Sequence, residues 1–179
     1  MERLDNSLDI LYAEDCEEDF SLFLDAFHEN GFSLSVKRVN NGQELVDYFL
    51  QENPLLPKLI ISDLNMPRKN GFEAVREIRG ASLLIKTPII IFSHSATTEN
   101  IRMSYDLGVN SFIQKPLSYQ GHLECVKNIH NFWFRLAQLP WLIFSKIFMK
   151  NIIRLFIFGA IIFGGWQANL KWEEFKPVL

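Results

Sequence analysis

The fold is decided by residues 58–67, KLIISDLNMP, in which an apolar run leads into Asp63 and a proline follows at position 67. Near-continuous apolar runs are typical of strands in parallel sheets that helices cover on both faces. Pro67 cannot continue a strand ladder, and the pair Asn70-Gly71 favours a loop or a helix start. We therefore predict a buried strand at 58–63, with Asp63 at its last position and facing a loop.

Three other apolar runs lead into polar residues in the same way. LDILYA (8–13) leads into Glu14 and Asp15, PIIIF (88–92) into Ser93, and VNSFIQ (109–114) into Lys115 and Pro116. These runs predict strands at 8–13, 88–93 and 110–114, and we expect a further strand at 33–39.

The segments between the predicted strands have helical patterns. Phe20, Phe23, Leu24 and Phe27 follow the spacing of a helix that packs on a sheet. Asn41 and Asn70 each stand three residues before a glutamate, as helix-capping residues do, and later helices are predicted at 98–107 and 119–136. Strands that alternate with helices form βαβ units. The sequence therefore predicts an α/β fold, a flavodoxin-like doubly wound five-stranded parallel sheet in the order 2-1-3-4-5.

The polar residues that follow the predicted strands are of the types that bind cations and phosphoryl groups. In such sheets ligands bind beyond the carboxyl ends of the strands. Glu14, Asp15 and Asp63 would supply carboxylate oxygens for Mg²⁺, and Asp63 could also act as a nucleophile on phosphorus. Lys115 and Ser93 would bind phosphoryl oxygens. We therefore predict a site for a divalent cation and a phosphoryl group.

Composition limits the class of protein. The 179 residues carry a net charge of −3, with −6 in residues 1–140 and +3 in residues 141–179. An acidic main segment argues against nucleic-acid binding. Cys16 and Cys125 lie far apart, which predicts no disulfide, and the N-terminus lacks the pattern of a signal peptide. We expect a cytoplasmic protein.

With these motifs in place, residues 7 to about 140 resemble the receiver domain of two-component response regulators. The resemblance rests on Glu14-Asp15, on DLNMP from Asp63, on Ser93 and on Lys115-Pro116. Within that family the chain is most similar to single-domain regulators of phytochrome kinases. That narrower resemblance rests on Ser104-Tyr105-Asp106-Leu107, Val109-Asn110 and the ending NFWFRLAQLP (131–140).

The resemblance implies a role for each motif residue. Asp63 matches the phosphoacceptor, which takes a phosphoryl group from a sensor histidine kinase. Asp15 and Glu14 match Mg²⁺ ligands, and Asn65 matches the residue whose backbone carbonyl completes the metal site. Ser93 and Phe112 match the switch pair, which alters the face formed by the fourth helix, fifth strand and fifth helix, and Lys115 matches the phosphate-binding lysine. The Lys115-Pro116 bond matches one that is often cis.

The same resemblance implies a signalling protein rather than an enzyme, with self-dephosphorylation as its only catalysis. Output would pass through protein contacts, including a homodimer, or back to the kinase as a phosphate sink. His94 departs from the small residue that is common in the family. It would restrict access to Asp63 or alter the lifetime of the phosphoryl group, or else it would be a loop histidine that faces water.

Two other function classes compete. A phosphatase of the haloacid-dehalogenase type also uses Asp and Mg²⁺ at a strand end, but it needs a second Asp where this chain has Asn65. A receiver-like scaffold that is never phosphorylated would not need the complete residue set. A P-loop enzyme is excluded because no GxxxxGK sequence occurs.

Residues 141–179 form a separate hydrophobic extension that follows a receiver domain at 1–140. No charge occurs from 155 to 170, which is short of the about 20 apolar residues of a spanning helix. Lys146, Lys150 and Arg154 are spaced by four and would form a basic stripe, as in helices that lie in a membrane interface. We expect membrane contact through 141–166, by a helix that lies in the interface or that spans the membrane with these basic side chains reaching its surface. A packed or dimer-forming helix and a segment without a selected role are the alternatives.

Overall fold

The structure is a computed structural model that describes residues 8–52, 54–80 and 86–139. Strands and helices alternate along the chain: β1 (Ile10–Ala13), α1 (Glu17–Glu29), β2 (Val36–Val39), α2 (Gly42–Leu50), β3 (Leu59–Ser62), α3 (Gly71–Gly80), β4 (Ile89–Ser93), α4 (Thr98–Asp106), β5 (Ser111–Gln114), α5 (Tyr119–His130) and the π-helical turn η1 (Asn131–Leu136).

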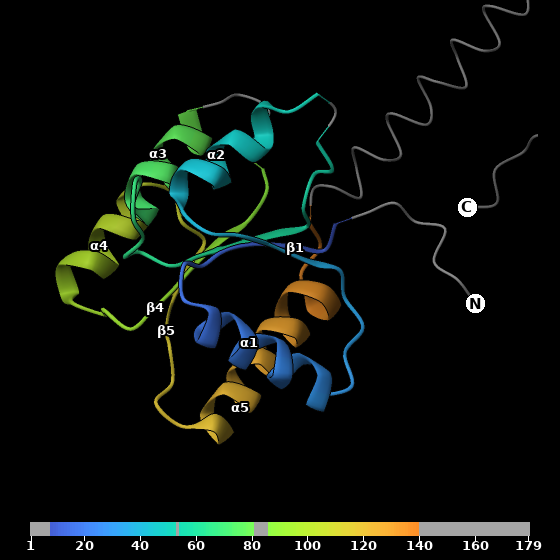
Figure 1. Cartoon of the computed structure of the whole chain (residues 1–179). Coiled ribbons are helices and arrows are strands. Elements are labelled where there is room, and N and C mark those ends of the chain that lie inside the picture. The colour runs from blue at the N-terminus through green and yellow to red at the C-terminus, as the bar shows by residue number, and fades with distance from the viewer. Residues whose placement is uncertain (1–7, 53, 81–85, 140–179) are drawn as a thin grey trace, which may run out of the picture. The chain divides into compact units, whose positions relative to one another are not determined.

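The five strands form one parallel sheet in the order β2-β1-β3-β4-β5. Helices α1 and α5 cover one face of this sheet, and α2, α3 and α4 cover the other (Figure 1). The predicted fold class and strand order are confirmed. The predicted boundary at residue 140 and the C-terminal helix lie outside the described residues, so both stay predictions.

Burial on both faces explains why the central strands are apolar throughout. On β1, Ile10 and Tyr12 pack into the cluster under α1 and α5, whereas Leu11 and Ala13 pack into the cluster under α2 and α3. All four residues are fully buried. Alternate side chains of one strand therefore serve two cores, which leaves only the strand ends for polar chemistry.

Local caps begin two of the helices as the sequence predicts. The Asn41 side chain accepts a hydrogen bond from the Glu44 backbone amide at 2.9 Å. Asn70 accepts one from the Glu73 amide at 3.0 Å, and the Glu73 carboxylate accepts from the Asn70 amide in return. Such reciprocal bonds satisfy amides that a helix start leaves without partners.

Most element bounds differ from the prediction by a few residues, and two of these differences concern the site and the last helix. Strand β3 ends at Ser62, so Asp63 is the first residue of the loop rather than the last of the strand. The predicted helix 119–136 is α-helical only to His130, after which the chain forms η1. The apolar periodicity runs through this junction without a break, so it carries no signal for the change.

No helix within the described ranges has the length and apolarity needed to cross a membrane. The hydrophobic segment 141–166, on which the membrane expectation rests, lies outside the described residues. That expectation stays a prediction.

Candidate functional site

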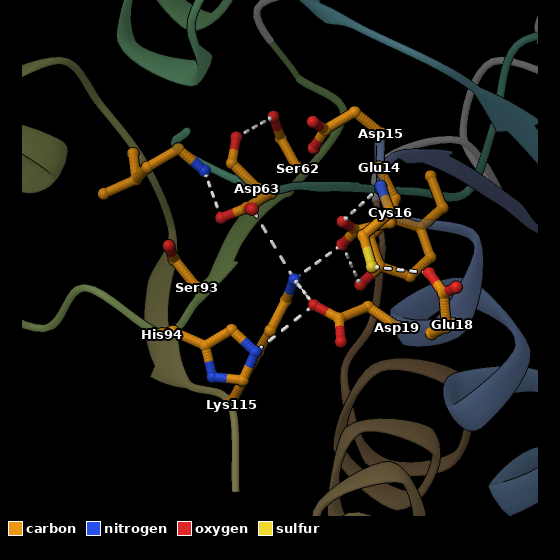
Figure 2. Close-up of polar contacts among 12 residues, drawn as sticks. Glu14, Asp15, Cys16, Glu18, Asp19, Ser62, Asp63, Ser93, His94 and Lys115 are labelled. Atoms are coloured by element: carbon orange, nitrogen blue, oxygen red, sulfur yellow. Dashed lines mark hydrogen bonds and ion pairs between the residues drawn. The ribbon is translucent and has the colours of Figure 1, made fainter. Parts of the chain in front are cut away.

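The predicted site residues converge at the carboxyl ends of the strands. Glu14 and Asp15 follow β1, Asp63 follows β3, Ser93 ends β4 and Lys115 follows β5. Carboxylate oxygens of Glu14, Asp15 and Asp63 all lie within 4.8 Å of one another. Lys115 extends toward this group from the end of β5 (Figure 2).

Asp63 is held in a tight loop. Its side chain is buried, and Oδ1 accepts a hydrogen bond from the Leu64 amide at 2.6 Å. Gly71 packs directly against its backbone, since a Cβ at that position would lie 2.3 Å from the Asp63 carbonyl oxygen. The close contact of the α3 start with the backbone of this loop explains why residue 71 is glycine, and the Leu64 amide orients the Asp63 carboxylate.

Glu14 is fully buried, and its carboxylate has three donors. Oε2 accepts from Tyr12 Oη at 3.0 Å and from Lys115 Nζ at 2.7 Å, and Oε1 accepts from the Cys16 amide at 3.2 Å. Burial raises the pKa of the Glu14 carboxyl, although the bonds from Lys115 and Tyr12 oppose this shift. These donors hold Glu14 against the site while leaving the exposed Asp15 free to meet a cation from the solvent side.

Lys115 is buried and touches three carboxylates. Its Nζ lies 2.7 Å from Glu14, 2.6 Å from Asp19 and 3.5 Å from Asp63. Although burial disfavours the charge, these acids raise the pKa of the Lys115 ammonium above its usual value. The lysine therefore places a positive charge beside Asp63, and its role in binding phosphate stays a prediction.

The two predicted switch residues occupy different environments. Ser93 is buried, and its hydroxyl accepts a long hydrogen bond of 3.4 Å from the Ser95 amide. Phe112 is half-buried on β5 and packs against the cluster under α2 and α3. Its amide donates to the exposed Tyr105 hydroxyl at 3.4 Å. Asn65 lies in the Asp63 loop with an exposed side chain.

The Lys115-Pro116 bond is trans, because no cis peptide bond occurs among the described residues. The expectation of a cis bond was wrong. A tertiary amide gives only a small preference between the two forms, so a motif match does not decide between them.

Three further residues at the site had no predicted role, and a fourth, His94, had its interpretation left open. Arg38 on β2 donates to the carbonyl oxygens of Glu14 and Asp15 at 2.8 and 2.9 Å and pairs with Glu17. Tyr12 donates to Glu14, and Asp19 accepts from Lys115. His94 Nε2 lies 3.2 Å from Asp19, so this half-exposed histidine is more than a solvent-facing loop residue.

Comparison with known proteins identifies this arrangement. The family model of the response regulator receiver domain matches residues 10–127. The chain belongs to this family. It is thus a receiver domain of the two-component signalling class rather than an enzyme of the ordinary kind, and the haloacid-dehalogenase alternative is no longer retained.

Two individual regulatory proteins, one of them a response regulator, are similar to this chain over most of their length. The receiver domain is 27% identical over 135 residues to response regulator Rcp1 of Synechocystis, covering 73% of this chain and 92% of that protein. It is 29% identical over 134 residues to a protein of Methanothrix harundinacea described as a probable methanogenesis regulatory protein, FilR2, covering 73% and 86% of the two chains.

Solved structures agree with this placement. The phosphorylated cyanobacterial phytochrome response regulator RcpA aligns with a TM-score of 0.69 at 33% identity, over 75% of this chain and 99% of RcpA. The Mn²⁺-bound form of Rcp1 aligns with a TM-score of 0.67 at 26% identity, over 74% and 99%. This receiver domain is therefore similar to the phytochrome-associated type in sequence and in structure.

Proposed function

We propose that the chain is a response regulator that accepts a phosphoryl group on Asp63 from a sensor histidine kinase. The proposal rests on the two kinds of group beside the Asp63 carboxylate. On one side Asp63 forms an acidic cluster of the metal-binding type with Glu14 and Asp15, and on the other it lies 3.5 Å from the ammonium group of Lys115. An isolated carboxylate attacks an anionic phosphoryl group poorly. Here Lys115 supplies positive charge on one side of the acceptor, and a cation held by the acidic cluster would supply it on the other.

The acidic cluster fits Mg²⁺. Three carboxylate oxygens within 4.8 Å are hard ligands, and Asp15 is exposed to water, which Mg²⁺ usually keeps in its coordination shell. Glu14, Asp15, Asp63 and the Asn65 carbonyl are the groups that would hold it. When bound, the cation would neutralise charge on the transferring phosphoryl group.

The residues of the chain then have separate tasks. An Asp63 oxygen attacks phosphorus in line with the phosphohistidine nitrogen of the kinase. The new O–P bond forms as the P–N bond breaks, and its electron pair returns to the imidazole. Lys115 binds one equatorial oxygen, because its Nζ is already 3.5 Å from Asp63. Ser93 donates to another once its hydroxyl turns from the Ser95 amide.

The phosphorylated state would change the α4–β5–α5 face. Ser93 would leave space when it moves toward Asp63, and the half-buried Phe112 on the neighbouring strand β5 would turn inward to fill it. The output would be a protein contact, either a homodimer or a downstream partner. A phytochrome-type kinase is the proposed donor, on the basis of the likeness to Rcp1 and RcpA. A role as a phosphate sink for that kinase is the second candidate.

The proposal is tested with a small phosphodonor. We expect phosphoramidate with Mg²⁺ to raise the intact mass of the full chain by one phosphoryl group, and chelation of the metal to prevent this. Asp63→Asn should abolish incorporation, whereas Asp47→Asn on the exposed side of α2 should retain it. Equal incorporation by Asp63→Asn and the wild type would refute the assignment.

The segment 141–166 calls for its own experiment. Sedimentation of the full chain and of a chain that ends at Pro140 with anionic vesicles measures whether the extension binds membranes. We expect only the full chain to sediment with the vesicles. Equal sedimentation of both chains would contradict membrane contact through this segment.

A further inference from the structure

One oxygen atom of Asp19 joins three elements around the phosphoacceptor. Asp19 lies in the first turn of α1, and its Oδ2 accepts from Lys115 Nζ at 2.6 Å. The same atom lies 3.2 Å from Nε2 of His94, the residue directly after Ser93. Figure 2 shows both contacts on one side of the site, away from the loop that carries Asp63.

Asp19 competes with Asp63 for Lys115. The lysine is nearer to Asp19 than to Asp63 by about an ångström, from 2.6 Å against 3.5 Å. A phosphoryl group brings a charge of about −1.5 to −2 to position 63. Lys115 would then shift its hydrogen bonds toward the phosphoryl oxygens, and the bond to Asp19 has to weaken.

The negative charge of Asp19 also opposes the phosphorylated state, because it repels the phosphoryl group. The Asp19 side chain is only 24% exposed, so solvent does not fully screen its negative charge from the phosphoryl group. The bond from Lys115 lowers the pKa of the Asp19 carboxyl even though burial opposes that shift. Asp19 is therefore an anion that the phosphorylated site must accommodate.

The His94 contact opposes movement of the loop after β4. Ser93 and His94 are adjacent, so a shift of Ser93 toward Asp63 displaces the backbone that carries the His94 ring. That ring is bound to α1 through Asp19. The contact has to stretch or break before the Ser93 hydroxyl can reach a phosphoryl oxygen.

We propose that Asp19 is a positioning residue that restrains the site in its unphosphorylated arrangement. It holds Lys115 on the α1 side, and through His94 it holds the loop that carries Ser93. This inference rests on the proposed function, because it assigns a means of regulation to the same phosphoryl site.

The test uses the full chain with Mg²⁺ and beryllofluoride, an aspartyl-phosphate mimic, and follows the backbone amide signals of Ser93 and His94 by NMR. Asp19→Asn keeps the shape of the side chain and removes its charge. We expect it to bind beryllofluoride about three- to tenfold more tightly than the wild type, as for loss of one partly buried opposing ion pair. Asp19→Glu, which keeps the charge, should return the affinity toward the wild-type value.

A matched control distinguishes the effect of losing the Asp19 contacts from the effect of changing the net charge of the chain. Asp25→Asn removes the same charge from an exposed position of the same helix, and we expect its affinity to equal that of the wild type. Unchanged or weaker binding by Asp19→Asn would overturn the proposal. A wild-type chain that binds no beryllofluoride would instead refute the proposed function itself.

His94 supplies a second, independent variant. Its side chain is 53% exposed, so His94→Ala is expected to fold. In the wild-type background this variant should tighten beryllofluoride binding about threefold, but in the Asp19→Asn background it should add nothing, because both changes break one contact. An equal effect of His94→Ala in both backgrounds would contradict the link through Asp19.

Discussion

Lys115 and Glu14 form an ion pair of 2.7 Å in which both side chains are almost wholly shielded from solvent, at 1% and 0% exposure. The pair lies directly beside the phosphoacceptor. A buried charge that loses its partner is costly, because neither water nor another ion replaces the missing interaction. The same residues that prepare the site for phosphoryl transfer therefore also carry part of its stability.

Lys115→Met tests this dependence. We expect the free energy of unfolding to fall by about 3–5 kcal/mol in urea denaturation at pH 7, since Glu14 is left buried without its cation. The double variant Lys115→Met/Glu14→Gln should recover much of that loss, because the second change removes the buried charge. Lys127→Met, an exposed lysine of α5, should change the stability little. A double variant no more stable than Lys115→Met would contradict the ion-pair explanation.

The approach of α3 to the Asp63 loop gives a prediction about glycine. A Cβ at Gly71 would lie 2.3 Å from a backbone oxygen, whereas nothing lies within 4 Å of one at Gly80. We expect Gly71→Ala to lower the free energy of unfolding by about 1–3 kcal/mol as in other overpacked sites. Gly80→Ala should leave it unchanged or slightly higher. Equal thermal denaturation curves for the two variants would show that the loop can move aside.

Arg38 is expected to support cation binding without touching the cation. Its guanidinium group donates to the carbonyls of Glu14 and Asp15, so it orients the backbone that carries both acids. Arg38→Gln should weaken Mg²⁺ binding about tenfold, as loss of an outer-shell partner does. The measurement is calorimetric titration with MgCl₂, with Arg76→Gln on the exposed side of α3 as the control. Wild-type Mg²⁺ affinity in Arg38→Gln would rule this role out.

At the opposite end of β1, away from the site, Asp9 is expected to make the stability of the chain depend on pH. Asp9 is buried and pairs with Lys58 at 2.8 Å and with the Ser35 amide at 2.8 Å. Burial opposes the shift, but these partners lower the pKa of the Asp9 carboxyl below 3.8. Its contribution to stability is therefore present above pH 3.8 and is lost as the pH falls through the lowered pKa.

Asp9→Asn should consequently destabilise the chain by about 1–3 kcal/mol at pH 7, as for a buried hydrogen bond to a charged group. The difference from the wild type should shrink as the pH falls below 3.8, because the unfolded carboxyl takes up a proton there and the folded one does so at its lowered pKa. Urea denaturation at pH 7, 5 and 3 measures this. Phosphoryl incorporation should persist in this variant, and its loss would mean that the two ends of the strand are coupled.

The sequence predicted the sheet and the residues at its carboxyl end because one physical pattern marks both. A strand that is buried on two faces is apolar along its whole length, so the first polar residue after it marks the end of the strand at the edge of the sheet. Asp63, Ser93 and Lys115 were found in this way. The pattern locates the end of a strand to within about a residue, which is why Asp63 lies just beyond β3 rather than within it.

The sequence contains no comparable pattern for Asp19 and Arg38, which contact the site residues from α1 and β2. Asp19 stands in an acidic first helical turn with Glu17 and Glu18, where carboxylates commonly face water. Its bond to Lys115 joins residues 96 positions apart and depends on how α1 packs on the sheet. Arg38 follows Lys37 on an edge strand, so in the sequence it looks like an ordinary exposed cation. Only the tertiary arrangement distinguishes these two from the other charged residues.

The most direct test of the central claim is the position of the phosphoryl group. The full chain is phosphorylated with phosphoramidate and Mg²⁺, the acyl phosphate is reduced with borohydride, and the peptides are sequenced by mass spectrometry. We expect Asp63 to be converted to homoserine and Glu14, Asp15 and Asp19 to remain unmodified. Reduction at any of those three acids with Asp63 intact would contradict it.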